Sequence, residues 1–146
     1  QCLQPLSEVQ TEAQAVKTVF DTDLKITIVS LDSTNQVPLT KALRIRWAKQ
    51  RQFPALDLIG QGYSLVHSFE ANSTYYLWDV LTTLVSKYPE LVDSKPIKAA
   101  VITDGPSAGK TFITDNGRPL TFVTQVNSDL FFDKIDELAQ AAKINY

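Results

Sequence analysis

Residues 98–124 have the sequence KAAVITDGPSAGKTFITDNGRPLTFVT, and they carry the clearest structural pattern in the chain. Two runs with alternating apolar residues, 111–114 and 120–124, flank the pair Asn116–Gly117. Asn-Gly between such runs is a strong hairpin signal, because both central residues of a type I′ turn need a positive φ. We therefore expect a β-hairpin over residues 111–125.

Apolar residues at helical spacing predict three helices: one over about 8–21, one that follows the N-cap candidates at 72–74 and ends at Pro89, and one over about 129–143. The last helix is expected to start at a capping residue, Asn127 or Ser128, whose side-chain oxygen accepts a backbone N–H of the first turn. These three helices are the elements that rest on local signals alone.

Alternating or continuous apolar runs predict further strands over 24–31, 63–69 and 99–103. Residues 42–48 are ambiguous. Leu43, Ile45 and Trp47 alternate with two arginines, which favours a strand, whereas the high helix propensity of Ala, Leu, Arg and Lys favours a helix. We favour the strand and keep the helix as the alternative.

Helices separated by groups of strands indicate an α+β fold. We expect an antiparallel sheet of about five to six strands, covered by about three helices in a single layer. Residues 1–6 are predicted to form an N-terminal tail, and residues 7–146 a single domain, which is an ordinary size for one hydrophobic core.

The composition excludes several classes of protein. Of the 146 residues, 44% are hydrophobic and the formal net charge is −2, which argues against gross disorder and against nucleic-acid binding through overall charge. No apolar run approaches the ~18 residues that a transmembrane helix needs. Peripheral membrane association stays open because the chain has one basic cluster, between residues 41 and 51.

The chain begins at Gln1 and contains no methionine, so we expect a processed N-terminus. On that basis we favour an extracytoplasmic setting, secreted or periplasmic, with a cytoplasmic fragment of a longer protein as the alternative. Cys2 is the one cysteine and cannot form an internal disulfide. A free thiol, an intermolecular bridge and a lipid anchor remain open for it.

Residues 104–111, Asp-Gly-Pro-Ser-Ala-Gly-Lys-Thr, resemble a phosphate-binding loop only at first sight. The phosphate-binding pattern places four residues between its two glycines, whereas three residues separate Gly105 from Gly109. Asp104 would repel a phosphate, and a strand follows where a helix is needed. We expect a loop between strands, with an exposed tip that could contact a ligand.

No catalytic constellation stands out. His67 is the one histidine, and no Gly-x-Ser-x-Gly elbow accompanies it. The acidic residues between 129 and 137 fit a solvated helix face, and no calcium-loop pattern is present. We therefore predict neither a metal site nor a cofactor.

Residues for contact with a ligand or partner are predicted from basic side chains, exposed aromatic side chains and the loop tip. They are Arg44, Arg46, Trp47, Arg51, Tyr76, Trp78, Asp104, Ser107 and Lys110. For Trp47 we favour a place in the core over a surface contact.

The favoured function is a non-enzymatic binding or assembly domain that acts through protein–protein contacts, with an acidic protein as one option for the partner. One alternative is a small-ligand sensor, with a pocket between sheet and helices lined by Tyr63, Phe69, Phe112 and Phe122. Another is a hydrolase that uses scattered serine and aspartate residues with His67. A polyanion-binding role is the least favoured.

Overall fold

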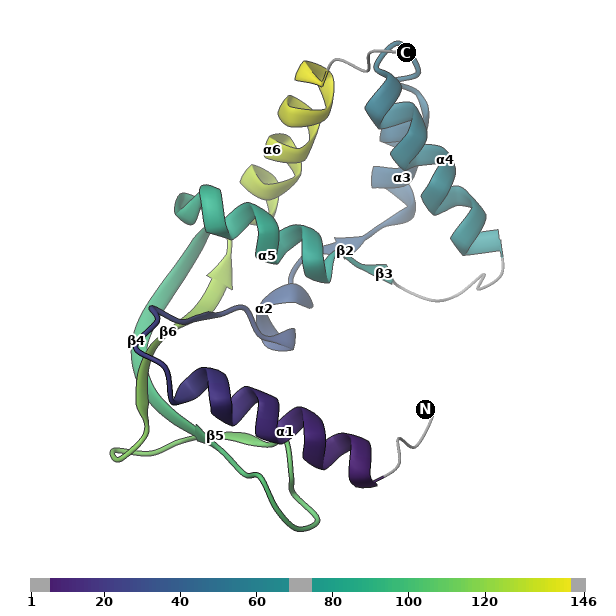
Figure 1. Cartoon of the computed structure of the whole chain (residues 1–146). Helices are drawn as coiled ribbons and strands as arrows, with labels where there is room; N and C mark the ends of the chain where they lie inside the picture. The colour runs from purple at the N-terminus through teal and green to yellow at the C-terminus, as the bar shows by residue number, and fades with distance from the viewer. Residues whose placement is uncertain (1–5, 69–74, 143–146) are drawn as a thin grey trace. The chain divides into compact units, whose positions relative to one another are not determined.

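The computed structural model of the chain describes residues 6–68 and 75–142, with side chains from residue 11 onward except at 64 and 66–68 (Figure 1). The helices are α1 Leu6–Phe20, α2 Leu31–Thr34, α3 Lys41–Ala48, α4 Pro54–Ser68, α5 Trp78–Lys87, the short 3₁₀ helix η1 Pro89–Leu91, and α6 Ser128–Ala141. The strands are β1 Thr27–Ile28, β2 Pro38–Leu39, β3 Tyr75–Tyr76, β4 Val92–Val101, β5 Thr111–Ile113 and β6 Arg118–Val126.

The chain divides into two compact units. Unit 1 comprises Gln1–Ile28 and Ser94–Val123, and unit 2 comprises Val29–Asp93 and Thr124–Tyr146. The expectation of a single domain over 7–146 stays a prediction. Within the described residues, no helix is long and apolar enough to cross a membrane.

The larger sheet is mixed, so the expected antiparallel sheet is wrong. Its strand order is β1-β6-β4-β5, with β1 parallel to β6 and β4 antiparallel to β5. A parallel pair needs a long crossover connection, which the chain between β1 and β6 supplies. The fold class is therefore a mixed α/β arrangement with more helices than predicted, and β2 and β3 form a separate two-stranded sheet.

The hairpin expected over 111–125 is also wrong, because β4 lies between β5 and β6 in the sheet. The chain does turn at Gly117, whose N–H donates to the Thr114 carbonyl at 3.0 Å. A Cβ on Gly117 would lie 2.6 Å from the backbone of Ala99 in β4. Glycine is needed at position 117 because two backbones pass closely there. A type I′ turn needs glycine at the same position of an Asn-Gly pair, so the sequence looks the same in both cases.

The tight β-hairpin of unit 1 joins β4 to β5 through residues 102–110. Gly109 N–H donates to the Ile102 carbonyl at 2.8 Å, and Ile102 N–H donates to the Lys110 carbonyl at 3.0 Å. Gly105 and Gly109 have φ values of 79° and 86°, which a residue with a Cβ rarely adopts. The expected loop between strands is therefore present at this position.

Residues 42–48 and 63–68 are helical, so both strand predictions are wrong. Thr40 caps α3 by accepting the Leu43 N–H at 3.2 Å, and helix propensity outweighs the alternating pattern. The two helices pack closely at Gly60, where a Cβ would lie 3.0 Å from the Ala48 nitrogen. The absence of a side chain at Gly60 therefore permits this close contact between the two helices.

Other predicted elements differ in extent. The strand expected over 24–31 shortens to β1, and α2 starts at Leu31, the last residue of that expected strand. Strand β4 starts at Val92, seven residues before the predicted strand at 99. The last helix is confirmed, with Asn127 accepting the Leu130 N–H at 3.1 Å.

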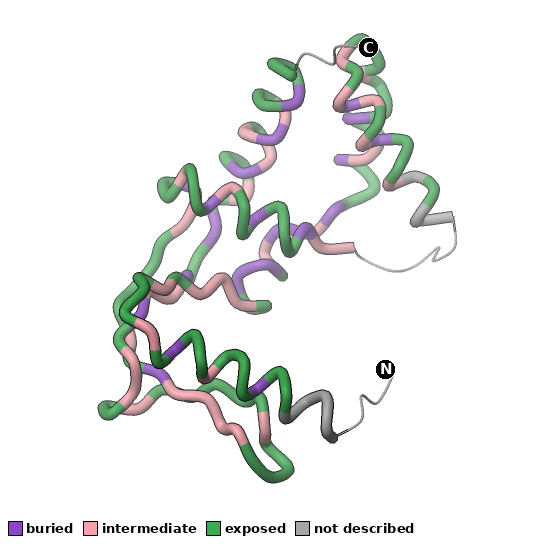
Figure 2. Tube along the Cα trace, in the orientation of Figure 1, coloured by how far each residue is buried: buried purple, intermediate pink, exposed green. Residues whose placement is uncertain are grey.

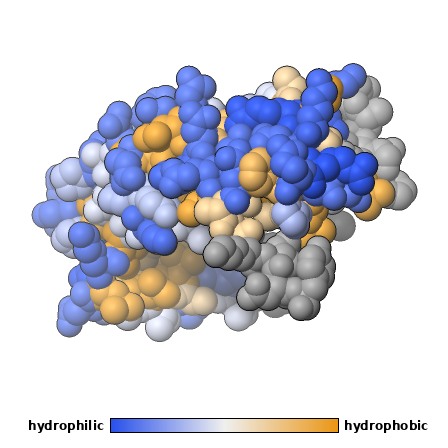
Figure 3. All heavy atoms as spheres, turned by 90° about the horizontal axis from the view of Figure 1, so that it is seen from above, coloured by the Kyte–Doolittle hydropathy of each residue, from blue (hydrophilic) through white to orange (hydrophobic). Residues whose placement is uncertain are grey.

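Each unit has its own apolar interior. In unit 1, Phe20, Ala99 and Leu120 form a buried cluster with Ile26, Ile28, Ile97 and Phe122 packed against it. In unit 2, the most deeply buried large side chains are Trp47, Leu39, Leu56, Leu81, Leu91 and Phe131. Figure 2 shows the buried positions of α5 and α6 recurring along each helix, as expected of amphipathic helices. Apolar side chains also reach the surface, as the orange areas of Figure 3 show.

Candidate functional site

Unit 2 contains a continuous row of aromatic rings drawn from four elements. From inside to outside it comprises Trp47 in α3, Tyr63 in α4, Tyr75 and Tyr76 in β3, and Trp78 at the start of α5. Successive centroids are 6.4 Å apart for Trp47 and Tyr63, 5.4 Å for Tyr63 and Tyr75, and 5.6 Å for Tyr75 and Trp78. Tyr76 stacks on Trp78 at 6.2 Å with 30° between the ring planes. We name these five residues the aromatic row.

The aromatic row runs from the core to the surface. Trp47 is 1% exposed, Tyr63, Tyr75 and Tyr76 are half-buried, and Trp78 is 43% exposed. Aromatic faces attract other flat π-systems, and a stacked nucleic acid base gains about 1–3 kcal/mol from one such contact. The exposed end of the row is thus suited to a flat, uncharged ligand, whereas the buried end fixes the position of the rest.

A carboxylate anchors the buried end. Trp47 Nε1–H donates to Asp136 Oδ1 at 2.6 Å, and Asp136 Oδ2 pairs with Arg46 Nη2 at 2.8 Å. The Asp136 side chain is 17% exposed, so little water competes for these contacts. Phe132, on the same helix α6, packs edge-on against Trp47 at 6.4 Å. These contacts hold the Trp47 ring in one orientation.

The middle of the row carries a phenol with an altered acidity. Burial, and to a smaller extent the neighbouring Tyr75, raises the pKa of Tyr63 above its ordinary value. A phenol of ordinary pKa already keeps its proton at neutral pH, and the raised pKa of Tyr63 extends this to more alkaline solution; the hydroxyl can donate a hydrogen bond as well as accept one.

An acidic residue lies beside the exposed end. Asp79 follows Trp78 directly, lies in the first turn of α5 and is exposed. A carboxylate accepts hydrogen bonds from hydroxyl groups such as those of a sugar. Among the side chains that the structure describes, no three histidine, cysteine, aspartate or glutamate residues come together as a metal would require.

The structure brings together part of the predicted contact set. Trp47, Tyr76 and Trp78 all belong to the aromatic row, but Trp47 is a core residue and not a surface contact. Arg46 pairs with Asp136, whereas Arg51 is 75% exposed and lies 3.3 Å from Asp57.

The remaining predicted contacts lie elsewhere. The Nε atom of Arg44 is buried and has no hydrogen-bond partner among the described residues. Asp104, Ser107 and Lys110 lie in the β4–β5 loop of unit 1, where Asp104 accepts from Thr103 Oγ1 at 3.0 Å and Ser107 accepts the Lys110 N–H at 3.1 Å. This loop belongs to unit 1 and the row to unit 2, so the two are separate candidates.

Two residues were missed at the level of the sequence. The sensor pocket predicted from Tyr63, Phe69, Phe112 and Phe122 stays a prediction; Tyr63 belongs to unit 2, and Phe112 and Phe122 belong to unit 1. Tyr75 and Asp136 were not singled out for binding. The closeness of Tyr75 and Trp78 in sequence is a local signal, whereas the approach of Asp136 to Trp47 spans 89 residues and leaves no local trace. Phe69 and the side chain of His67 lie outside the described residues.

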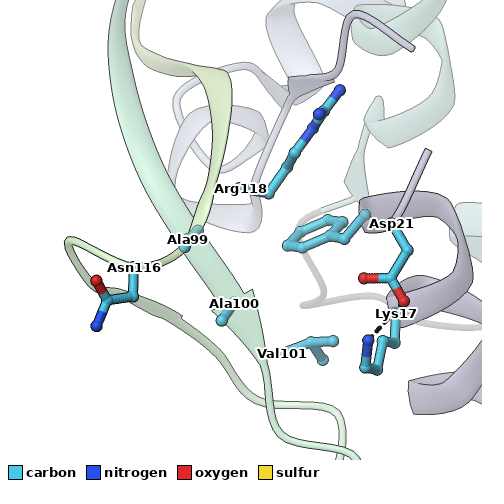
Figure 4. Close-up of a pocket in the computed structure, with 9 residues that line it drawn as sticks. Lys17, Asp21, Ala99, Ala100, Val101, Asn116 and Arg118 are labelled. Carbon is cyan, nitrogen blue, oxygen red and sulfur yellow. Dashed lines mark hydrogen bonds and ion pairs between the residues drawn. The ribbon is translucent and has the colours of Figure 1, made fainter. Parts of the chain in front are cut away.

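Unit 1 contains a small pocket of about 160 Å³ between the end of α1, β4 and the turn before β6 (Figure 4). Lys17 and Asp21 lie on one side of it and Ala100 and Val101 on the other. Lys17 is paired with Asp21 at 2.5 Å, and Arg118 Nη2 donates to the Leu24 carbonyl at 2.8 Å. Since both cations are engaged, this pocket is a weaker candidate than the aromatic row.

Comparison with known proteins gives a consistent result. The sequence model of the family described as inosine-uridine preferring nucleoside hydrolase matches residues 9–133. No curated protein matches the chain. Among solved structures, the inosine-uridine preferring nucleoside hydrolase from Bacillus anthracis is 42% identical, with a TM-score of 0.79 over 88% of this chain and 41% of that enzyme.

Two more distant structures show the same fold. An inosine-guanosine nucleoside hydrolase is 19% identical, with a TM-score of 0.77 over 90% of this chain and 44% of its own. The purine-preferring ribonucleoside hydrolase from Gardnerella vaginalis is 23% identical, with a TM-score of 0.68 over 88% of this chain and 45% of its own. The chain thus spans less than half the length of the structures it matches.

These matches correct the functional prediction. A non-enzymatic binding or assembly domain is wrong, because the family model over 9–133 and the structure from Bacillus anthracis both describe hydrolytic enzymes. The predicted secreted or periplasmic setting is contradicted by the same matches. The hydrolase alternative is better supported than the favoured function, although its scattered serine and aspartate residues and His67 stay a prediction.

Proposed function

Because the chain belongs to the inosine-uridine preferring nucleoside hydrolase family, we propose that it supplies the base-binding part of a site that hydrolyses nucleosides. In this reaction water cleaves the bond between base and sugar; the hydroxyl joins the anomeric carbon and a proton joins the base. The base stacks on the exposed end of the aromatic row, on Trp78 and Tyr76. Hydrolysis is the property of a protein with the full length of the fold.

One observation carries the proposal. The stacked pair of Tyr76 and Trp78 continues a row of rings from a fixed core to the surface, and its last member is 43% exposed. A nucleoside base is flat and uncharged, so stacking recognises it without a charged partner. Purines and pyrimidines both offer a π-face, so the row itself sets no strict preference between them.

Asp79 accepts hydrogen bonds from the sugar of the bound nucleoside. It is exposed and adjacent to Trp78, so a base stacked on the row would bring the sugar hydroxyls within reach of its carboxylate. A hydrogen bond to a charged group contributes roughly 1.5–3 kcal/mol, which exceeds the contribution of a neutral one. Stacking and the carboxylate together would therefore distinguish a nucleoside from a free base.

The test is to titrate the chain with inosine and with uridine and to measure each affinity by isothermal titration calorimetry. Replacing Trp78→Ala is expected to weaken binding about 5- to 150-fold, which corresponds to about 1–3 kcal/mol of stacking. Trp78→Phe should keep most of the affinity, since it keeps an aromatic face. The matched control is Phe112→Ala, because Phe112 is 40% exposed and lies in unit 1. Equal affinity of the Trp78→Ala variant and the unmodified chain would refute the proposal.

A further inference from the structure

Helix α4 has an exposed face that carries no charge. Leu58, Gln61, Gly62 and Leu65 are all exposed and follow one another at i, i+3, i+4 and i+7, so they share one side of the helix. Leu58 is 70% and Leu65 is 68% exposed. We name these four residues the open α4 face; much of α4 is drawn as exposed in Figure 2.

The opposite side of α4 is already packed. Leu56 is fully buried, Gly60 lies against the backbone of Ala48, and Tyr63 joins the aromatic row. A helix that is apolar on two opposite sides is typical of one covered on both, because a solvated helix carries polar residues on its outer face. Gly62 adds to this, since a Cβ there would meet nothing within 4 Å and a neighbouring backbone could approach closely.

We propose that the open α4 face is covered by the part of a nucleoside hydrolase fold that this chain does not span, packed with it within one fold. The matched structures each have more than half of their length outside the match, since the chain covers 41% to 45% of them. That remainder must pack on some surface of the shared part. The open α4 face is the kind of surface that such packing requires.

A second copy of this chain is the weaker occupant. From Leu58 to Leu65 the face is only ~10 Å long at 1.5 Å per residue, and about as wide as a helix. Two such faces together would bury far less than the ~1,200 Å² of a stable protein–protein interface. Packing within one fold has no such minimum, because the contact adds to a core that is already assembled and loses no translational freedom.

The experiment places one double variant, Leu58→Glu with Leu65→Glu, in two settings. The first is the 146-residue chain alone. The second is a chimera in which this chain replaces the matched part of the Bacillus anthracis enzyme, whose 42% identity favours a compatible fit. We expect the melting temperature to change by less than about 2 °C in the chain alone and to fall by more than about 6 °C in the chimera. The matched control, Leu58→Met with Leu65→Met, should change neither.

Each alternative outcome overturns the proposal. An unchanged melting temperature in the chimera would mean that nothing covers the face. A dimer of the chain alone that light scattering shows to dissociate in the glutamate variant would assign the face to a second copy. As a check independent of the chimera, the positions of the Bacillus anthracis enzyme that align with Leu58 and Leu65 must be covered by residues outside the match; exposed positions there refute the proposal. Nucleoside binding plays no part in these measurements, so they fail or succeed separately from the proposed function.

Discussion

The anchor of the aromatic row offers the sharpest test of the packing described above. Replacing Asp136→Ala removes both the acceptor of the Trp47 indole N–H and the partner of Arg46. The indole nitrogen belongs to a ring that is 1% exposed, so water cannot replace the lost acceptor without opening the core. We expect a large loss of stability from this single change.

The magnitude follows from the geometry of each contact. A hydrogen bond of 2.6 Å to a carboxylate contributes roughly 1.5–3 kcal/mol. The ion pair adds less than about 1 kcal/mol, because the Arg46 side chain is 43% exposed and solvent screens it. Asp136→Ala should therefore destabilise unit 2 by about 2–4 kcal/mol. Asp136→Asn keeps an oxygen acceptor and should cost about half as much.

Urea unfolding measures this effect. The chain has two tryptophans, so a Trp78→Phe background leaves Trp47 as the one indole and makes its fluorescence report on unit 2. With a urea dependence of about 2 kcal/mol per molar, the midpoint should fall by about 1–2 M. Arg46→Ala separates the ion pair from the indole hydrogen bond, and Asp133→Ala, an exposed acidic residue on the same helix, is the matched control.

Two results would refute this reasoning. A midpoint in Asp136→Ala that matches the one in Asp133→Ala would mean that the indole hydrogen bond does not contribute to stability. A loss in Arg46→Ala as large as that in Asp136→Ala would transfer the effect from the hydrogen bond to the ion pair.

Three further predictions concern other parts of the chain. Gly117→Ala should cost about 1–3 kcal/mol in urea unfolding because its Cβ would clash with the Ala99 backbone, whereas Gly62→Ala, with open space around it, should be neutral or stabilising by up to about 1 kcal/mol. The pKa of Tyr63 is raised by burial, so its phenol loses its proton more readily in the unfolded chain; stability should fall as the pH rises from about 10 towards the folded pKa, and melting curves of Tyr63→Phe should show a smaller fall. Asp79→Ala should weaken inosine binding about 10- to 150-fold by calorimetry while the melting temperature stays unchanged, because the side chain is exposed.

Local signals predicted the elements whose determinants are local. Helix α6 was found from its cap at Asn127 and its apolar stripe, and the apolar stripe also predicted α1. The segments 42–48 and 63–68 were misassigned because alternating apolar residues fit a short helix that is buried on one side as well as a strand. The close packing of Gly60 against Ala48 allows α3 and α4 to lie side by side. No sequence feature near either residue indicates this contact.

The pair Asn116–Gly117 shows a second kind of failure. A type I′ turn and a close backbone crossing both require glycine, so the pair has the same appearance in either case. What separates them is the position of β4 between β5 and β6, which depends on residues 92–101 pairing on both sides. The order of strands in a sheet is a property of the whole chain, and a two-residue motif cannot supply it.

The candidate site illustrates the same limit. Both tryptophans were named as candidate contacts, because residue type indicates a capacity for stacking and not a depth in the fold; for Trp47 the core was the favoured place. Trp47 is buried since Asp136, distant in sequence, satisfies its N–H, whereas Trp78 stays at the surface at the start of α5. Depth distinguishes the two ends of the row: the buried end confers stability, and the exposed end is the part that we propose binds the base. A change at Asp136 should therefore lower the free energy of unfolding, whereas a change at Trp78 should weaken nucleoside binding. Stability and binding would then depend on opposite ends of the aromatic row.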